Sequence, residues 1–485
     1  MYDVQYTDVL SSSKRIIERN RSGFTSPMSA QTPILPCRDH SAISITPSQA
    51  PLHRLQSPSF EIPYSILSHL ETASQHLHAS RTVAFPTETV YGLGASSLDP
   101  KAVKKIYEIK NRPFDNPLII HVSSLDMLQR LLPPPEVYHI SKLYHALIAA
   151  FWPGPLTLLF PSSNSPPPPA PQTSAIRMPA HPLALALIHH ADLPLSAPSA
   201  NSSGRPSPTK AQHVHHDLNG AEGLGCILDG GDCGVGVEST VVDGLSWKEA
   251  GGGSVNILRP GGLGIEDIAR VVADADGHDD VTQILVHGKA WRRIAGASSS
   301  KRSLSLAVTS DLPPATPGMK YKHYSPRIPV YLLMPSTTFQ RPSTTAGTTP
   351  QAVLRQIAAK IRRNGKRPRL GLLHYENSPL SQRLLEHTEA DTLPMSLGPT
   401  PEVAAQRLFS GMLELEGSGT VEDGKIGEGV DAILIEGCSE EGLGLAVMER
   451  IGKAVGGARP GGGAEGTKDG LEEGNGDDGR FWVEV

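Results

Sequence analysis

Residues 63–273 carry two alternating hydrophobic patterns, one typical of strands and one typical of helices. Short apolar, β-branched or aromatic runs predict strands at 82–85, 117–122, 155–160, 175–178, 226–228, 239–242 and 255–258. Apolar positions spaced along one helical face predict helices at 183–191, 208–218 and 265–273. Strands and helices that interleave in this way predict an α/β domain with a mixed sheet.

One further helix has explicit start and stop signals. Asp99 suits the N-cap position, and Pro100 suits the first helical position that follows it. Pro113 disfavours the helical conformation at Arg112, so we expect this helix to end near Asn111.

Residues 329–455 alternate in the same manner and predict a second domain. Strands are predicted at 329–334, 370–374 and 431–435, and helices at 351–364, 401–416 and 441–454. Gly365 follows the first of these helices and suits its C-terminal cap. The pattern predicts a smaller, parallel α/β domain of the Rossmann-like kind.

The remaining segments lack a core pattern. Residues 1–62 predict a disordered or targeting extension, 274–328 a basic linker, and 456–485 a disordered, acidic, Gly-rich tail, while 162–172 is a Pro-rich insertion. Basic and Ser-rich stretches near the N-terminus resemble a mitochondrial presequence, but Asp3, Asp8 and Glu18 argue against a clean one. We therefore expect a cytoplasmic protein for which mitochondrial import is possible.

Charge, cysteines and hydropathy exclude several classes of protein. The net charge is 44 − 49 = −5, and residues 460–485 account for all of it, which leaves a neutral body that does not suggest a nucleic-acid binder. None of the four cysteines forms a CxxC pair, so no zinc knuckle is predicted. No apolar run reaches the roughly 18–20 residues of a membrane span, and we expect a soluble protein without a membrane partner.

Candidate chemistry gathers in loops next to the predicted strands. The clusters are 86–94 (PTETVYGLG), 110–121, 196–204 (SAPSANSSG), 234–243 (GVGVESTVVD) and 257–261 (ILRPG). Gly residues allow close backbone approach, and Thr, Ser and backbone N–H groups supply donors. Ser207 is expected to cap the helix that starts near Pro208, whose N-terminus would suit a phosphate.

Four cations stand out within or beside these clusters. Lys110 and Arg112 can converge on a polyanion, although basic residues also compensate the dipole at a helix C-terminus. Arg259 precedes a Pro-Gly turn, another place for an anion. Arg177 lies in an apolar strand and needs a carboxylate partner, from the protein or from a ligand. The chain has no GxxxxGK[ST] loop, so bound ATP would need dispersed side chains.

These motifs, in this order, resemble the YrdC-like family. The resemblance also includes FWPGPLTLL at 151–159, SAIRMPAHP at 174–182, and TPGMKYKHYSP at 316–326, which looks like the linker of the long two-domain form, the threonylcarbamoyl-AMP synthases. It covers roughly residues 63–455. The implied fold is a YrdC-like domain with a twisted mixed sheet at 63–273, followed by the smaller parallel domain at 329–455.

The resemblance implies a nucleotidyl transfer. L-threonine, bicarbonate and ATP would give L-threonylcarbamoyl-adenylate and pyrophosphate. The product would serve N6-threonylcarbamoyladenosine formation in tRNA, another enzyme would complete that transfer, and the expected partner is tRNA or the downstream transfer complex. Mg²⁺ is expected with ATP and not on protein ligands.

By the same resemblance, each site residue has an implied role. ATP would be held by Lys110, Arg112, Asn116, Thr173, Ser199, Asn201, Ser207, Arg259 and Tyr324, of which Lys110 and Arg112 would be catalytic. Threonine would be held by Thr89, His121, Arg177, the backbone of Ala197, and Ser239. Lys320, Tyr321 and His323 would form a gate across the site.

Two other classes of protein share features with this sequence. A double-stranded RNA-binding or tRNA-binding module without its own catalysis would use the basic residues on a phosphate backbone, and the basic linker leaves room for it. Carbamoyl transferases of hydrogenase maturation also contain a YrdC-like domain, but they carry CxxC zinc fingers and an acylphosphatase-like domain, which this chain lacks.

Overall fold

A computed structural model provides the structure of the chain. It describes residues 31–48, 55–163, 173–276, 282–291, 323–341, 347–361, 367–386, 391–417, 421–422, 425–426, 429–455 and 479–485. Most of the segments expected to be an extension, an insertion, a linker and a tail lie outside these residues, namely 1–30, 164–172, 292–322 and 456–478. Residues 32–485 form one unit that contains two large sheets.

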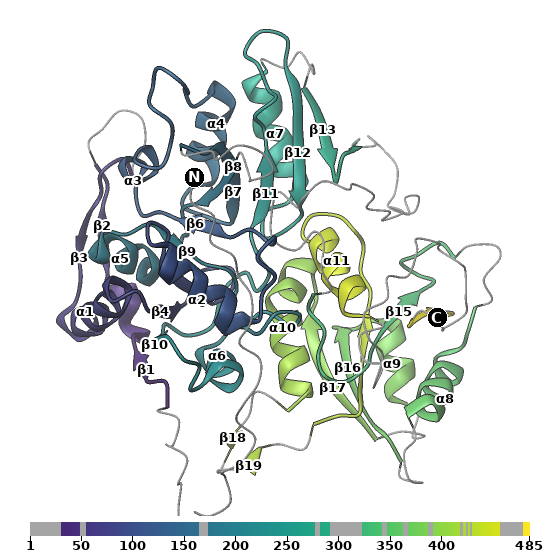
Figure 1. Cartoon of the computed structure of the whole chain (residues 1–485). Coiled ribbons are helices and arrows are strands. Elements are labelled where there is room, and N and C mark those ends of the chain that lie inside the picture. The colour runs from purple at the N-terminus through teal and green to yellow at the C-terminus, as the bar shows by residue number, and fades with distance from the viewer. Residues whose placement is uncertain are drawn as a thin grey trace, which may run out of the picture. The chain divides into compact units, whose positions relative to one another are not determined.

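The first sheet has twelve strands and mixes parallel with antiparallel pairs, which confirms the predicted mixed sheet (Figure 1). In sheet order its strands are β1 (Ile34–Pro36), β10 (Leu224–Asp229), β4 (Thr82–Phe85), β5 (Gly92–Ser96), β9 (Leu195–Ser196), β6 (Ile119–His121), β8 (Thr173–Arg177), β7 (Leu156–Pro161), β11 (Thr240–Asp243), β12 (Gly253–Arg259), β13 (Thr282–Val286) and β14 (Lys289–Ala290). All seven strands predicted for this domain are present.

Helices cover both faces of this sheet because side chains of a strand alternate between faces. On β4, Val83 and Phe85 pack into a core with α1 and α5, whereas Ala84 packs into a core with α2 and α6. The helices are α1 (Tyr64–His78), α2 (Pro100–Lys110), α3 (Leu125–Gln129), α4 (Lys142–Phe151), α5 (Pro182–Ala191), α6 (Ala211–Leu218) and α7 (Ile265–Ala275). Asp99 caps α2 by accepting from the Lys101 amide, and Asn111 ends it, as predicted.

The boundaries at residues 62 and 274 need correction. β1 lies in the expected extension, yet it pairs in parallel with β10, and β2 (Ser44–Thr46) pairs with β3 (Ser59–Glu61). β13 and β14 lie in the expected linker, yet they extend the sheet beyond β12. These strands are short, and β1 joins a partner about 190 residues away in the chain, so the local pattern did not reveal them.

The second sheet is entirely parallel, which confirms the Rossmann-like prediction (Figure 1). Its order is β17 (Asp391–Gly398), β16 (Arg369–Tyr375), β20 (Ala432–Glu436), β15 (Val330–Pro335) and β21 (Arg480–Val483). α10 (Pro401–Leu415) and α11 (Gly444–Ala454) share a core with one face, and α8 (Pro350–Ile361) and α9 (Pro379–Leu385) with the other. A separate pair, β18 (Val421–Glu422) and β19 (Lys425–Ile426), is antiparallel.

β21 corrects the prediction for the end of the chain. Residues 480–483 fall in the expected disordered tail, but they form an edge strand on β15 and bury Phe481. Gly and acidic residues dominate the composition of the tail and mask this short apolar segment. Across the described ranges, no helix combines the length and the apolar character that crossing a membrane requires.

Candidate active site

A cleft opens between loops of the first sheet and the end of the predicted linker, at His323 and Tyr324. Thirteen of the predicted site residues line it: Thr89, Lys110, Arg112, His121, Arg177, Ala197, Ser199, Asn201, Ser207, Ser239, Arg259, His323 and Tyr324. They come from strand ends and loops that are far apart in the chain. The structure therefore brings nearly the whole predicted set to one place, while the ligand that each residue binds stays a prediction.

Four predicted residues are not part of this lining. Asn116 is buried behind Arg112, and its backbone carbonyl accepts from that guanidinium at 3.0 Å. Thr173 begins β8 and pairs with Pro161, away from the lining residues. Lys320 and Tyr321 lie outside the described residues.

Lys110 and Arg112 are buried in the cleft wall and donate to backbone carbonyls. The Lys110 ammonium donates to the carbonyls of Ser199 and Asn201, the former at 2.5 Å. Arg112 donates to the carbonyls of Asn116 and Pro117 at 3.0 and 2.8 Å. Within the described ranges, neither cation forms an ion pair. Two buried cations without a carboxylate partner favour binding of an anion.

Burial shifts the pKa of both groups. Desolvation, and then the neighbouring Arg112, hold the pKa of Lys110 well below its usual value. Desolvation lowers the pKa of Arg112 to about 10. Both shifts reflect charge that the protein alone does not compensate, and a bound polyanion would reverse them.

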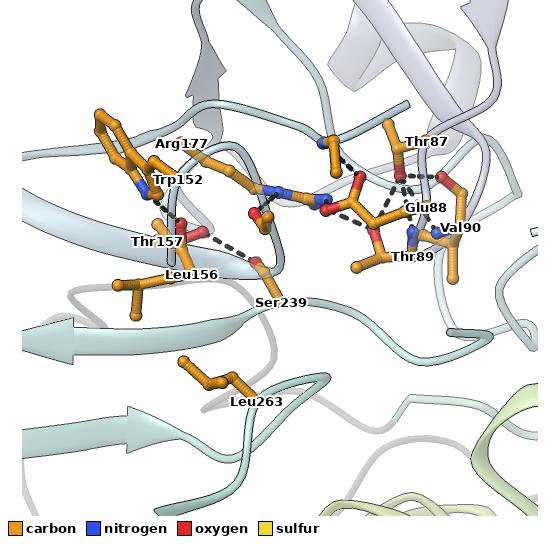
Figure 2. Close-up of polar contacts among 12 residues, drawn as sticks. Thr87, Glu88, Thr89, Val90, Trp152, Leu156, Thr157, Arg177, Ser239 and Leu263 are labelled. Carbon is orange, nitrogen blue, oxygen red and sulfur yellow. Dashed lines mark hydrogen bonds and ion pairs between the residues drawn. The ribbon is translucent and has the colours of Figure 1, made fainter. Parts of the chain in front are cut away.

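Arg177 does have a protein carboxylate partner, and that partner is Glu88 (Figure 2). The guanidinium also donates to Thr89 Oγ1 at 2.9 Å and to the Gly154 carbonyl at 3.2 Å. The second oxygen of Glu88 accepts from the Ala180 amide at 3.0 Å. The sequence left open whether the partner was protein or ligand, and Glu88 was not singled out although it lies within the PTETVYGLG cluster.

The threonines of this cluster fix the turn that carries Glu88. Thr87 Oγ1 lies 2.7 Å from Thr89 Oγ1 and donates to the Val90 carbonyl at 2.7 Å (Figure 2). The same oxygen accepts from the Thr89 and Val90 amides, each at 3.2 Å. The turn therefore holds Thr89 and Glu88 toward the end of β8, where Arg177 lies.

His121 lies in the same part of the cleft and is uncharged. Burial, and then the charge of Arg177, lower the pKa of His121 to about 3. Its Nδ1 lies 3.2 Å from the Ile119 carbonyl. The imidazole therefore contributes a neutral hydrogen-bonding group to the cleft near neutral pH.

Arg259 and Ser239 form another part of the cleft wall. Arg259 donates to the Ser239 carbonyl from two nitrogens, at 3.1 and 2.9 Å, and to Ser239 Oγ at 3.2 Å. Ser239 Oγ also lies 2.8 Å from Thr157 Oγ1 (Figure 2). Burial lowers the pKa of Arg259. This wall thus presents a buried guanidinium and a hydroxyl whose orientations are set by each other.

Ser207 does not cap a helix, which corrects the sequence prediction. α6 begins at Ala211, its N-cap is Lys210, and no side chain caps it. Ser207 instead donates to Glu238 Oε1 at 2.6 Å. Local composition pointed to a cap, but the buried carboxylate 31 residues later takes the hydroxyl. Glu238 itself lines the cleft and was not singled out from the sequence.

Of the predicted gate, only His323 falls within the described residues, and it lines the cleft together with the next residue, Tyr324, a predicted ATP contact. Tyr324 is 5% exposed, and its ring centroid lies 5.1 Å from that of Phe409 on α10. Burial, and then Arg112, lower the pKa of His323 to about 4. The end of the predicted linker thus forms part of the cleft wall.

Comparison with known proteins agrees with this architecture. A family model described as telomere recombination matches residues 75–261, and the model of the C-terminal domain of threonylcarbamoyl-AMP synthase matches residues 265–456. Threonylcarbamoyl-AMP synthase of Schizosaccharomyces pombe is 40% identical over 84% of this chain and 94% of its own length. That of Bacillus subtilis is 36% identical over 79% and 92%.

Solved structures show the same relationship. The chain is similar to Pyrococcus abyssi Sua5 complexed with L-threonine, with 36% identity, a TM-score of 0.57, and coverage of 80% of this chain and 94% of that one. A doubly substituted form of the same archaeal protein gives 34% identity and a TM-score of 0.60, over 88% and 96%. On both its domains and its full-length relatives, the chain belongs to the threonylcarbamoyl-AMP synthase family of enzymes.

Proposed function

We propose that the chain makes L-threonylcarbamoyl-adenylate and pyrophosphate from L-threonine, bicarbonate and ATP. The observation that carries this proposal is the pair of buried cations, Lys110 and Arg112, which have no ion-pair partner in the described residues and line the cleft. The names of the relatives, and the archaeal structure complexed with L-threonine, support the choice of substrates.

The cations of the cleft differ in charge balance, and this suggests how the cleft holds two ligands. Lys110 and Arg112 suit the triphosphate, because burial disfavours their charged forms and a polyanion would compensate them. Arg177 already has Glu88, so it suits a ligand with a carboxylate and an amine, such as threonine, better than a polyanion. Thr89 and neutral His121 add hydrogen-bonding groups beside it.

The proposed chemistry needs charge stabilisation more than a strong base. The threonine amine forms a bond to the carbon of bicarbonate, one C–O bond of that carbon breaks, the oxygen leaves as water with the protons released, and a carbamate remains. A carbamate oxygen then forms a bond to the α-phosphorus of ATP, the bond from that phosphorus to the bridging oxygen breaks, and pyrophosphate leaves with the electron pair. Negative charge spreads over phosphate oxygens in the transition state, where Lys110 and Arg112 would lower its energy.

We propose that Mg²⁺ enters with ATP rather than on a protein site. The described part of the chain has no group of three or more His, Cys, Asp or Glu side chains arranged for a metal. Asn201 Oδ1 and Ser203 Oγ are buried without hydrogen-bond partners, and both residues line the cleft. Ser203 Oγ can donate to a phosphate, whereas Asn201 Oδ1 can accept from a nucleotide hydroxyl or from a water of the ion. The ion, carried by the phosphates, would supply neutralisation of their charge.

The chemistry of the product indicates that the next reaction is a transfer of the threonylcarbamoyl group, and the acceptor that we propose is RNA. A carbamoyl-adenylate is a mixed anhydride and would be consumed by transfer of its acyl group to an amine. We propose that this amine is N6 of adenosine in tRNA and that another enzyme completes the transfer.

The test is pyrophosphate release by the full chain, with the adenylate identified by mass. We expect release to require L-threonine and bicarbonate together. Equal release with serine, or without an amino acid, would contradict the proposal. If the chain binds tRNA but releases no pyrophosphate under any combination, the RNA-binding alternative replaces it.

A further inference from the structure

Arg450 reaches from α11 of the second domain to the wall of the catalytic cleft. It is 1% exposed, and its Nε and Nη2 donate to Glu238 Oε2 at 3.1 and 2.9 Å. Its Nη1 donates to the Pro260 carbonyl at 2.6 Å. One side chain therefore holds both the segment that carries Ser239 and the turn that follows Arg259.

Glu238 is the one carboxylate among the described residues that line this cleft. Its other oxygen accepts from Ser207, a predicted ATP contact, at 2.6 Å. A bare carboxylate at this position would repel a triphosphate across a poorly screened distance. It would also leave Ser207 bonded to a group free to rotate.

We propose that Arg450 is a positioning residue of the active site: it neutralises Glu238 and fixes its orientation, so that the cleft accepts a polyanionic nucleotide. This inference rests on the proposed use of ATP. Through Arg450 the second domain would contribute to catalysis without contacting a substrate.

Two observations separate this role from general packing. The fork geometry of Arg450 on one carboxylate oxygen and one carbonyl is specific to a guanidinium, and its Cζ lies 5.8 Å from the ring centroid of Tyr324, another cleft residue. Lys210 and Glu414 form a different ion pair between the two domains, at 2.8 Å, and neither lines the cleft. That pair provides a matched control.

The experiment is calorimetric titration of the full chain with Mg²⁺-ATP and, separately, with L-threonine. In Arg450→Met we expect the Kd for ATP to rise about tenfold or more, because a buried charge loses its partner, while the Kd for threonine changes less than about threefold. The double variant Arg450→Met with Glu238→Gln should recover most of the ATP affinity. Lys210→Met should leave both Kd values unchanged.

The pH dependence of ATP affinity is a second measurement, and a purely structural role of Arg450 would not change it. In Arg450→Met the pKa of Glu238 should rise, so the loss of ATP affinity relative to wild type should shrink as the pH is lowered. Equal losses for ATP and threonine, or no recovery in the double variant, would overturn the inference. Failure of the wild-type chain to bind ATP would instead overturn the proposed function.

Glu238→Gln alone keeps the inference testable if Arg450→Met does not fold. Removal of the carboxylate while Arg450 remains should leave ATP binding equal or tighter, whereas a loss of more than about threefold in ATP affinity would contradict the proposed neutralising role.

Discussion

Arg177 at the end of β8 and Glu88 in the turn before β5 form an ion pair, although 89 residues separate them in the chain. The arginine keeps further N–H groups beyond those given to Glu88, Thr89 and Gly154. It can therefore meet a ligand carboxylate while Glu88 holds its orientation and balances its charge.

Arg177→Ala should weaken threonine binding more than ATP binding. The substitution removes the proposed contact to the threonine carboxylate and leaves Glu88 without its ion-pair partner near the ligand. We expect the binding free energy of threonine to weaken by about 2–4 kcal/mol. Calorimetry with each ligand measures the difference. Glu88→Gln, which keeps the guanidinium but loosens it, should have a smaller effect on threonine. Equal losses for ATP and threonine in Arg177→Ala would reject the assignment.

Because the pKa of Lys110 is lowered, we expect the protein to take up protons when ATP binds. Burial holds the pKa of Lys110 well below its usual value in the ligand-free protein, and a bound triphosphate would raise it again. ATP affinity should therefore fall as the pH rises above the lowered pKa. Calorimetry in buffers of different ionisation enthalpy gives the number of protons taken up. Lys110→Met should lose most of this uptake and bind ATP about 100-fold more weakly; unchanged uptake would contradict the prediction.

Features with local signals were predictable from the sequence. The caps of α2, Asp99 and Asn111, act within one turn of the helix, so the pattern alone located both ends. The cations of the site were found for a related reason: Lys110 and Arg259 stand at the ends of regular elements, where ligands of α/β domains gather.

Features that depend on distant partners were not predictable. Ser207 is a residue type that often caps helices, but its hydroxyl donates to Glu238. Glu238 lies 31 residues away in the chain and comes into contact with Ser207 only in the folded protein. Glu238 in turn has Arg450 as its ion-pair partner, 212 residues away and in the other domain, and faces Arg259 as well. The strand Ile34–Pro36 is short and finds its place on β10 through tertiary pairing alone.

Glu238 should make a visible contribution to acid stability. Burial alone would raise its pKa, but Arg450, Arg259 and the Ser207 hydroxyl together lower it from 4.5 to about 2. A carboxyl group whose pKa is lower in the folded than in the unfolded state stabilises the fold at any pH above its unfolded-state pKa. This stabilisation is lost as the pH falls to its folded-state pKa. The window is therefore between pH 4.5 and about 2, with a loss on the order of 3 kcal/mol.

Urea unfolding across this pH window tests the contribution. The wild-type chain should lose stability more steeply with acid than Glu238→Gln, which has no carboxyl to protonate. Glu136→Gln, at an exposed position, should follow the wild-type slope. Parallel slopes for wild type and Glu238→Gln would show that the carboxyl is not held ionised by its buried partners.

Alanine substitutions at Gly236 and Gly231 together distinguish two contributions to the free energy of unfolding, backbone strain and contact between the domains. Its φ is 80°, and a Cβ there would lie 2.4 Å from Gln406 Cα and 2.5 Å from the Ala405 carbonyl oxygen, both backbone atoms of α10. Gly231 has φ 83°, and a Cβ there would meet nothing within 4 Å. Gly231→Ala should therefore cost only the conformational strain, about 1–2 kcal/mol. Gly236→Ala should cost at least about 2 kcal/mol more, because the backbone of α10 must move. Urea unfolding of both variants gives the difference, and equal costs would mean that α10 does not pack on this turn in solution.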